Sequence, residues 1–255
     1  KADIDITINN ASGTSITMNK GTVFNTTVDE TSYQYVNNQD ITITPVNGVY
    51  KFSNCTLYEG SLVTFKYTVD VNDPDQKFVI PSNRADTSTL KISVQNSVTD
   101  TTTSTYTFAS DYSNVGLNTK AYFLQEGQDG RFEVYFGDGV SGIKLSDGNI
   151  VIMEYIVTNT TESNGASSFS LAGNVGGFTD VTITVNSVSQ GGAEAETDDS
   201  IKFNAPLSYA AQNRAVTSSD YETFVKQIYP NALSVSAWGG EDDEIPVYGV
   251  VKIAI

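Results

Sequence analysis

The glycines between positions 137 and 142 form the pattern in this sequence that most resembles a ligand-binding motif. Gly137, Gly139 and Gly142 follow a G-x-G-x-x-G spacing, which in dinucleotide-binding proteins holds a pyrophosphate against the N-terminus of a helix. Residues 143–148 lead into another turn and then into the apolar run at 150–153, so no helix follows the glycines. We therefore interpret the motif as a glycine-shaped β turn and expect no bound cofactor.

Oxygen-bearing side chains gather at Asp70, Asn72, Asp73 and Asp75, a ligand set that suits Ca²⁺. The spacing lacks the central glycine and the distal glutamate of an EF-hand loop. Pro74 lies among them, and proline within a run of Asn and Asp is typical of a turn. The sequence therefore favours a turn here, and we expect no metal site.

Catalytic chemistry is restricted by the absence of histidine from the chain. Without His, Ser-His-Asp and Cys-His nucleophile activation is excluded, as is every zinc site that uses His. Paired carboxylates could still hydrolyse a glycoside, but the 30 acidic residues do not single out one pair. The acidic run at 241–244 is best explained as a solvated loop, because packed like charges repel. We therefore expect no enzymatic activity and no small-molecule substrate.

The overall charge limits the classes of partner. A net charge of −16, from 30 acidic and 14 basic residues, argues against nucleic acid, because phosphates would be repelled. Anionic membranes are disfavoured for the same reason, and no apolar run approaches the roughly 20 residues that span a bilayer. Cys55 is the single cysteine, so no disulfide forms within the chain. Other proteins are therefore the expected partners.

Strand patterns dominate the first three-quarters of the chain, where threonine is abundant. Apolar residues alternate with polar ones at 63–69 and 132–136, and 150–153 is continuously apolar. Turn-forming residues separate such segments at short intervals, as in β-sandwiches and barrels. We predict a mainly β fold of sandwich-like or barrel-like units, followed by a smaller α+β part that contains helices.

Two features of the sequence, a cluster of turn residues and a shift in composition, suggest domain boundaries. One is the turn cluster at 72–75, and the other is the glycine-rich, acidic connector at 190–194, after which alanine replaces threonine. The chain ends in an apolar strand without a turn, so we expect a fragment of a longer polypeptide, truncated in its last domain. The predicted domains are 1–72, 73–188 and 189–255.

A capped helix is predicted over residues 218–229, where apolar residues recur at helical spacing. Two capping boxes fit its start, either Ser219 with Glu222 or Thr217 with Asp220. The apolar stripe consists of Tyr221, Phe224, Val225 and Ile228.

A weaker helical pattern covers residues 198–205 and should end before Pro206, which lacks a backbone N–H. We expect the stripe of the capped helix to pack against the apolar strand near residues 247–253. This would give the C-terminal part its own α+β core.

The C-terminal part, 189–255, is also where we expect self-association. The terminal apolar strand would carry unpaired backbone groups, which invite another strand. Trp238 could supply an aromatic anchor, although a tryptophan that closes the local core is the simpler explanation. The alternative is contact through residues 1–72. The candidate interface residues are Trp238, Tyr248, Val251, Ile253 and Ile255.

Two stretches resemble a known family. The first is a strand with a Gly-Asp-Gly turn at 132–139, a central strand at 150–157 and a Gly-Asn-Val at 173–175. The second, more specific stretch is Arg-x-Val-Thr-x-x-Asp-Tyr-Glu at 214–222. In these features the chain resembles the baseplate J-like proteins of contractile phage tails, which include the wedge subunits of T-even phages. The likeness covers roughly residues 120–255, and the earlier part matches only loosely.

The resemblance implies a structural subunit of a tail baseplate that self-associates, as a homodimer or ring, and joins wedges into a ring around the hub. It implies other baseplate wedge proteins as partners, assembly in the host cytoplasm and a final place in the virion. The alternative is an extracellular β-sandwich adhesin or carbohydrate-binding module, which the threonine-rich strands also fit. The predicted α+β tail argues against that alternative.

Overall fold

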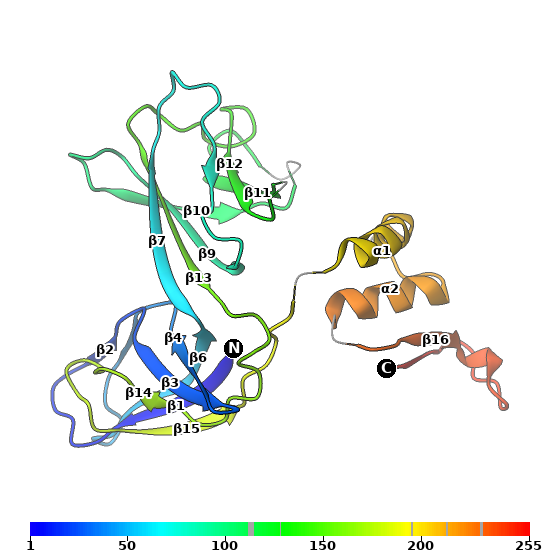
Figure 1. The fold of residues 1–255 in the computed structure, drawn as a ribbon, viewed down its shortest axis with the longest axis horizontal. Helices are drawn as coiled ribbons and strands as arrows, with labels where there is room; N and C mark the ends of the chain where they lie inside the picture. Colours follow the sequence, from blue (N-terminus) through cyan, green and yellow to red (C-terminus); the bar gives the residue numbers. More distant parts are fainter. Residues whose placement is uncertain (112–114, 128, 195, 213, 230–231) are drawn as a thin grey trace. The chain divides into compact units, whose positions relative to one another are not determined.

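The computed structural model of the chain describes residues 1–111, 115–127, 129–194, 196–212, 214–229 and 232–255. The chain divides into two compact units, Lys1–Gly192 and Ala193–Ile255. The first unit is built from strands, and the helices of the described residues lie in the second (Figure 1). The prediction of a mainly β fold with a smaller helix-containing part is confirmed.

The first lobe of the first unit is a six-stranded sheet in the order β14-β3-β4-β6-β1-β15, with β2 and β5 forming a separate pair. In β1, Ile4, Ile6 and Ile8 are buried, and the residues between them are only partly covered. This alternation places one face of the strand in the core of the lobe. The strands are β1 (Ala2–Ile8), β2 (Ile16–Met18), β3 (Val23–Val28), β4 (Thr31–Val36), β5 (Ile41–Ile43), β6 (Tyr50–Glu59), β14 (Ser170–Leu171) and β15 (Val181–Ser187).

Asp5, on the other face of β1, ties this strand to both of its neighbours. Its Oδ2 lies 2.6 Å from Nζ of Lys51 on β6. Its Oδ1 accepts hydrogen bonds from the backbone N–H of Asn54 at 2.8 Å and from Nδ2 of Asn186 on β15 at 2.7 Å. These contacts favour the carboxylate, Lys51 most strongly, and lower the pKa of Asp5 from 3.8 to about 2.

The second lobe is a seven-stranded sheet in the order β7-β13-β9-β10-β11-β12-β8. Only β10 and β11 run parallel to each other among these pairs of described strands. Val151 and Met153 on β13, which lies between β7 and β9, are fully buried, and Ile152 between them is half-buried. The strands are β7 (Ser61–Thr68), β8 (Phe78–Val79), β9 (Ala85–Gln95), β10 (Thr103–Phe108), β11 (Ala121–Glu126), β12 (Phe132–Phe136) and β13 (Ile150–Val157).

The membership of the two sheets does not follow the sequence division at residue 72. β7 belongs to the second lobe, and β14 and β15 return to the first, where β15 pairs with β1 through Ile6 and Ile183. The outer edge of β1 needs a partner, and the antiparallel β15 supplies its hydrogen bonds. The domain bounds at 72 and 188 remain a prediction.

The chain passes from the first lobe to the second through Gly60, between β6 and β7. Its φ of +112° is accessible to glycine, and a Cβ there would lie 2.0 Å from the carbonyl oxygen of Val157. The adjacent buried Glu59 accepts hydrogen bonds from the backbone N–H and Nδ2 of Asn159, at 2.8 and 2.7 Å, where the chain leaves β13. Both crossings between the lobes are therefore held by close contacts at one place.

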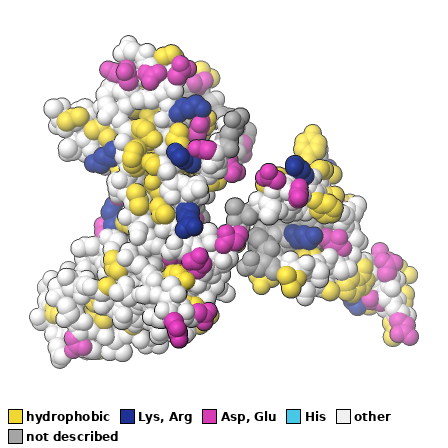
Figure 2. Space-filling view, viewed as in Figure 1, with side chains coloured by type: hydrophobic (Ala, Val, Ile, Leu, Met, Phe, Trp, Pro, Cys, Tyr) yellow, Lys and Arg dark blue, Asp and Glu magenta, His cyan; other side chains and the backbone are white. Residues whose placement is uncertain are grey.

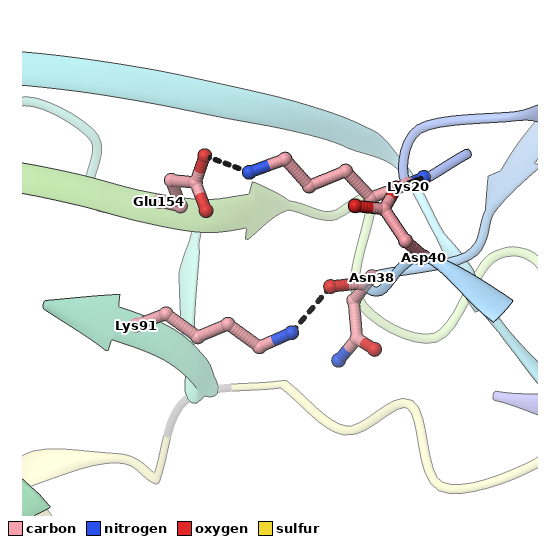
Figure 3. Close-up of polar contacts among 5 residues, drawn as sticks. All are labelled: Lys20, Asn38, Asp40, Lys91 and Glu154. Carbon is pink, nitrogen blue, oxygen red and sulfur yellow. Dashed lines mark hydrogen bonds and ion pairs between the residues drawn. The ribbon is translucent and has the colours of Figure 1, made fainter. Parts of the chain in front are cut away.

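Polar side chains also bridge the two lobes (Figure 3). Nζ of Lys20, which precedes β3, lies 2.5 Å from Oε1 of Glu154 on β13. Nζ of Lys91 on β9 donates to the carbonyl oxygen of Asn38. The backbone N–H of Lys20 donates to Oδ1 of Asp40 at 2.7 Å, which fixes the segment that carries the lysine. Each lobe thus contributes one lysine to the contact.

The second unit contains α1 (Asp198–Ala211), α2 (Ser218–Ile228), β16 (Ser236–Gly239), the short 3-10 helix η1 (Gly240–Asp242) and β17 (Val251–Ala254). The prediction that the first helix ends before Pro206 is wrong, because α1 continues to Ala211. Proline removes one internal hydrogen bond, but its fixed φ is compatible with a helix. A hydrogen bond of 2.8 Å from Gln227 to Ser208 also holds the later part of α1 beside α2.

The predicted helix near 218–229 is confirmed as α2, and its capping box is the one formed by Thr217 and Asp220. The Thr217 hydroxyl accepts from the backbone N–H of Asp220 at 3.3 Å, and the Asp220 carboxylate accepts from the N–H of Thr217 at 2.8 Å. The hydrogen bonds that the carboxylate accepts from the N–H groups of Thr217 and Val216 lower the pKa of Asp220. Among the described residues, no helix is long and apolar enough to cross a bilayer.

Candidate assembly surface

The G-x-G-x-x-G motif is a turn, as the sequence indicates. It follows β12 directly, and the N–H of Gly139 donates to the carbonyl of Gly142 at 3.0 Å. Oδ1 of Asp138 accepts from the N–H groups of Val140 and Ser141 at 2.8 and 2.9 Å, and these bonds lower its pKa. Three N–H groups that could otherwise face a phosphate are thus bonded within the loop.

The acidic cluster at 70–75 is likewise a turn. Oδ1 of Asp70 accepts from the N–H of Asn72 at 2.9 Å, and Oδ1 of Asp73 accepts from the N–H of Asp75 at 3.0 Å. Across the described part of the chain, no three or more His, Cys, Asp or Glu residues are grouped to hold a metal ion. The carboxylates here shape the backbone.

A cleft of about 450 Å³ in the second lobe is lined by Phe78, Phe136 and Leu145, with charged side chains at its rim. One of these, Glu133, is bonded to Lys77 at 2.9 Å and to the hydroxyl of Tyr135. The bonds from Tyr135 and Lys77 lower the pKa of Glu133. A carboxyl group whose pKa is lowered is poorly suited to act as a general acid.

The second unit exposes most of its large apolar side chains. Within its described residues, only Ala211, Ala237 and Gly240 are buried. Of the exposed large apolar side chains among the described residues, more than half belong to this unit, although it is much the smaller of the two. They are Ile201, Phe203, Tyr209, Val216, Ile228, Tyr229, Leu233, Ile245, Val247, Tyr248, Val250, Val251, Ile253 and Ile255. Exposed apolar side chains of this kind are candidates for contact with other protein surfaces.

The apolar stripe of α2 is only partly covered. Tyr221, Phe224 and Val225 are half-buried, and Ile228 is 81% exposed. α2 packs on β16, where the carboxylate of Glu222 accepts from the N–H of Ala237 at 3.0 Å, and the expected strand near 247–253 lies beyond β16 as β17. The stripe is therefore not the centre of a closed core within this unit.

The five predicted interface residues lie together on the hairpin of β16 and β17. Trp238 pairs with Lys252 across the hairpin. It is half-buried, and its Nε1 donates to Oδ1 of Asp243 at 3.1 Å. Asp243 also forms an ion pair with Lys252, which with the Trp238 bond lowers the pKa of Asp243. Trp238 thus closes a local cluster.

The other four predicted residues are exposed. Tyr248 is 81% exposed and Ile255 70%, and Val251 and Ile253 on β17 are each 42% exposed. Their contact with another molecule remains a prediction. The sequence reasoning missed Ile245, which is also 81% exposed and follows the acidic run directly.

Two comparisons with known proteins confirm the resemblance to baseplate wedge subunits. The family described as "Baseplate structural protein gp6, C-terminal domain I" matches residues 217–255. Baseplate wedge protein gp6 of Enterobacteria phage T4 is 26% identical to the chain over 244 residues. The aligned part covers 86% of this chain, more than the motifs alone indicated, and 36% of the T4 protein. The chain thus spans about a third of the length of the curated relative.

Proposed function

From this likeness we propose that the chain is part of a structural subunit of a contractile phage tail baseplate, located in the virion. The observation that carries the proposal is the similarity to the T4 wedge protein along 86% of the chain. The apolar surface of the second unit supports it, because a baseplate subunit must bury such a surface against its neighbours. The proposed partners are other wedge proteins.

We further propose that the chain self-associates through the second unit and contributes to joining wedges into a ring around the hub. A stable protein contact buries about 1,200–2,000 Å² of surface in total. The exposed apolar residues of this unit provide apolar surface that such a contact could bury. The net charge of −16 opposes contact between identical copies. Added salt should therefore strengthen self-association by screening this repulsion. Contact through residues 1–72 is the competing proposal.

We propose that the subunit has no enzymatic role. The sequence contains no histidine, which removes the commonest general base. The cleft lined by Phe78 and Phe136 holds a carboxylate that is already bonded to Lys77 and Tyr135. A glycosidase would need one carboxyl group held protonated and facing a second across a cleft.

The structural role is tested by labelling purified virions with gold-conjugated antibodies raised against the chain. We expect label at the distal end of the tail, where the baseplate lies. Label confined to fibres or to the capsid, or none on intact and disrupted particles, would contradict the role.

Self-association is tested separately by light scattering on the full chain over a range of salt concentrations. We expect a mass above the 27.4 kDa of one chain and a reduced mass for the pair Val251→Ser and Ile253→Ser on β17. The control is Val98→Ser, which removes a 75% exposed apolar side chain from the first unit. Equal masses for all three proteins would exclude the second unit as the contact.

A further inference from the structure

The loop that joins β16 to β17, residues 240–250, is here called the hairpin tip. It is held in shape by its own backbone. The N–H of Gly240 donates to the carbonyl of Val250 at 2.8 Å, and the N–H of Val247 donates to the carbonyl of Gly240 at 2.9 Å. Asp243 is held at the base of the tip by Trp238 and Lys252. The tip is therefore organised before it meets a partner, which lowers the entropy cost of binding.

The exposed side chains of the tip include three carboxylates and four large apolar side chains, of which two are strongly exposed. Ile245 and Tyr248 are each 81% exposed. Glu241, Asp242 and Glu244 are exposed as well, and none forms an ion pair with another described residue. Acidic and apolar side chains accordingly lie together at the hairpin end of this unit (Figure 2). The tip thus carries exposed apolar side chains together with carboxylates that no described lysine or arginine pairs with.

We propose that the hairpin tip inserts into an apolar pocket of a different protein, one whose rim carries lysine or arginine side chains. The inference rests on the proposed function as part of an assembly and names the chemistry of one partner. Complementary charge at the border of an apolar contact steers association and selects against wrong partners. An aromatic side chain at the centre of such a contact is a common hot spot.

A second copy of the chain fits this tip poorly. If two tips met about a two-fold axis, the three carboxylates of one tip would lie close to the three carboxylates of the other. These like charges would repel. The apolar cleft of the second lobe offers Lys77 and Lys144 at its rim, but Asp73 and Glu133 line the same cleft. Lys77 is already paired with Glu133 at 2.9 Å. The two-tip arrangement supplies no positive charge, and in the cleft Lys144 is accompanied by two carboxylates that would repel the acidic tip.

Salt separates the two kinds of contact. Binding of the acidic tip to a basic rim should weaken as ionic strength rises, because the attraction is screened. Self-association of an acidic chain should respond in the opposite direction. The same protein therefore has two contacts whose salt dependence differs in sign.

The test replaces Tyr248 in the full chain with the photo-reactive amino acid p-benzoylphenylalanine, in baseplates purified from the phage that carries the chain. Illumination should cross-link the tip to a different polypeptide, at a site flanked by Lys or Arg in mass spectrometry. The triple variant Glu241→Lys, Asp242→Lys and Glu244→Lys should reduce the product by at least about tenfold. The same amino acid at Val98 is the control and should give little product.

Cross-linking to a second copy, or within the same polypeptide, would overturn the inference. Baseplates that contain the chain but give no cross-link from position 248, or an undiminished one from the triple variant, would overturn it too. Because the altered side chains are exposed, these variants should fold, which circular dichroism of the full chain verifies. Absence of the chain from purified baseplates would instead contradict the proposed function, and the inference with it.

Discussion

Replacing Gly60 by alanine should destabilise the first unit far more than the same replacement at Gly48. A Cβ at Gly60 would lie 2.0 Å from the carbonyl oxygen of Val157 and 2.8 Å from its carbonyl carbon. At Gly48, which also has a positive φ, of +76°, a Cβ would meet nothing within 4 Å. The two variants share the cost of an L-residue at positive φ and differ in the collision.

The strain at Gly48 should cost about 1 kcal/mol of the free energy of unfolding. At Gly60 the backbone of β13, or the junction of β6 and β7, must also move by more than about 1 Å, which we expect to raise the cost to about 4 kcal/mol or more. A unit of this size loses about 2–4 °C of melting temperature per kcal/mol, so we expect falls of roughly 3 °C for Gly48→Ala and 10 °C or more for Gly60→Ala.

Differential scanning calorimetry of the two variants and the parent chain measures this difference directly. The transition of the first unit should shift in both variants, with the larger shift in Gly60→Ala. If both variants melt within about 1 °C of each other, Gly60 does not lie as close to the backbone of Val157 as described. The connection between the two lobes would then need a different description.

Thr217→Ala should lower the stability of α2 by about 1 kcal/mol, whereas Ser219→Ala should have little effect; circular dichroism on heating would contradict the observed cap if the order were reversed. Because the pKa of Asp5 is lowered to about 2, its contribution to stability is present above pH 3.8 and is lost as the pH falls towards 2. Asp5→Asn should thus lose less melting temperature than the parent chain between pH 5 and pH 2, and equal losses would show that this carboxylate is not involved. In urea unfolding, a double-mutant cycle of Lys20→Met and Glu154→Gln should give a coupling free energy of about 0.5–1 kcal/mol that decreases with added salt. The absence of coupling at low salt would show that this ion pair does not link the two lobes.

Local patterns in the sequence identified elements whose cause is local. The alternation at 132–136 is β12, since successive side chains of a strand face opposite sides. For α2, the pattern left two capping registers, and the structure selects Thr217 because the carboxylate of Asp220 reaches back to its N–H. The rival residue Glu222 binds the N–H of Ala237 instead, which is a contact between elements that spacing along the helix does not reveal.

Long-range pairing was beyond the sequence reasoning. Nothing in residues 181–187 indicates that this segment pairs with the first strand of the chain, since an alternating pattern fits many partners. The sequence analysis ended α1 at Pro206, because the sequence does not reveal the contacts that let the helix continue to Ala211. Local sequence patterns therefore predict structure least well where segments distant in the sequence pack together.

The sequence indicated which C-terminal apolar residues are exposed, but not how the acidic residues beside them are arranged. The apolar C-terminal residues pointed to the hairpin of β16 and β17, and Tyr248 and Ile253 are exposed there. The acidic run at 241–244 was interpreted as uniformly solvated, yet Asp243 turns inward to Trp238 and Lys252. That inward turn depends on the pairing of the two strands, which sequence spacing does not define.

Hydrogen exchange of the full chain, free and within purified baseplates, tests the central claim most directly. Amides of the second unit, from Ser236 to Ala254 above all, should exchange more slowly in the baseplate, because the exposed apolar surface is then covered. Amides of the turn around Val98 serve as the internal reference. Protection that appears in the second unit would support its role as the contact surface. Unchanged exchange throughout this unit in assembled baseplates would contradict it.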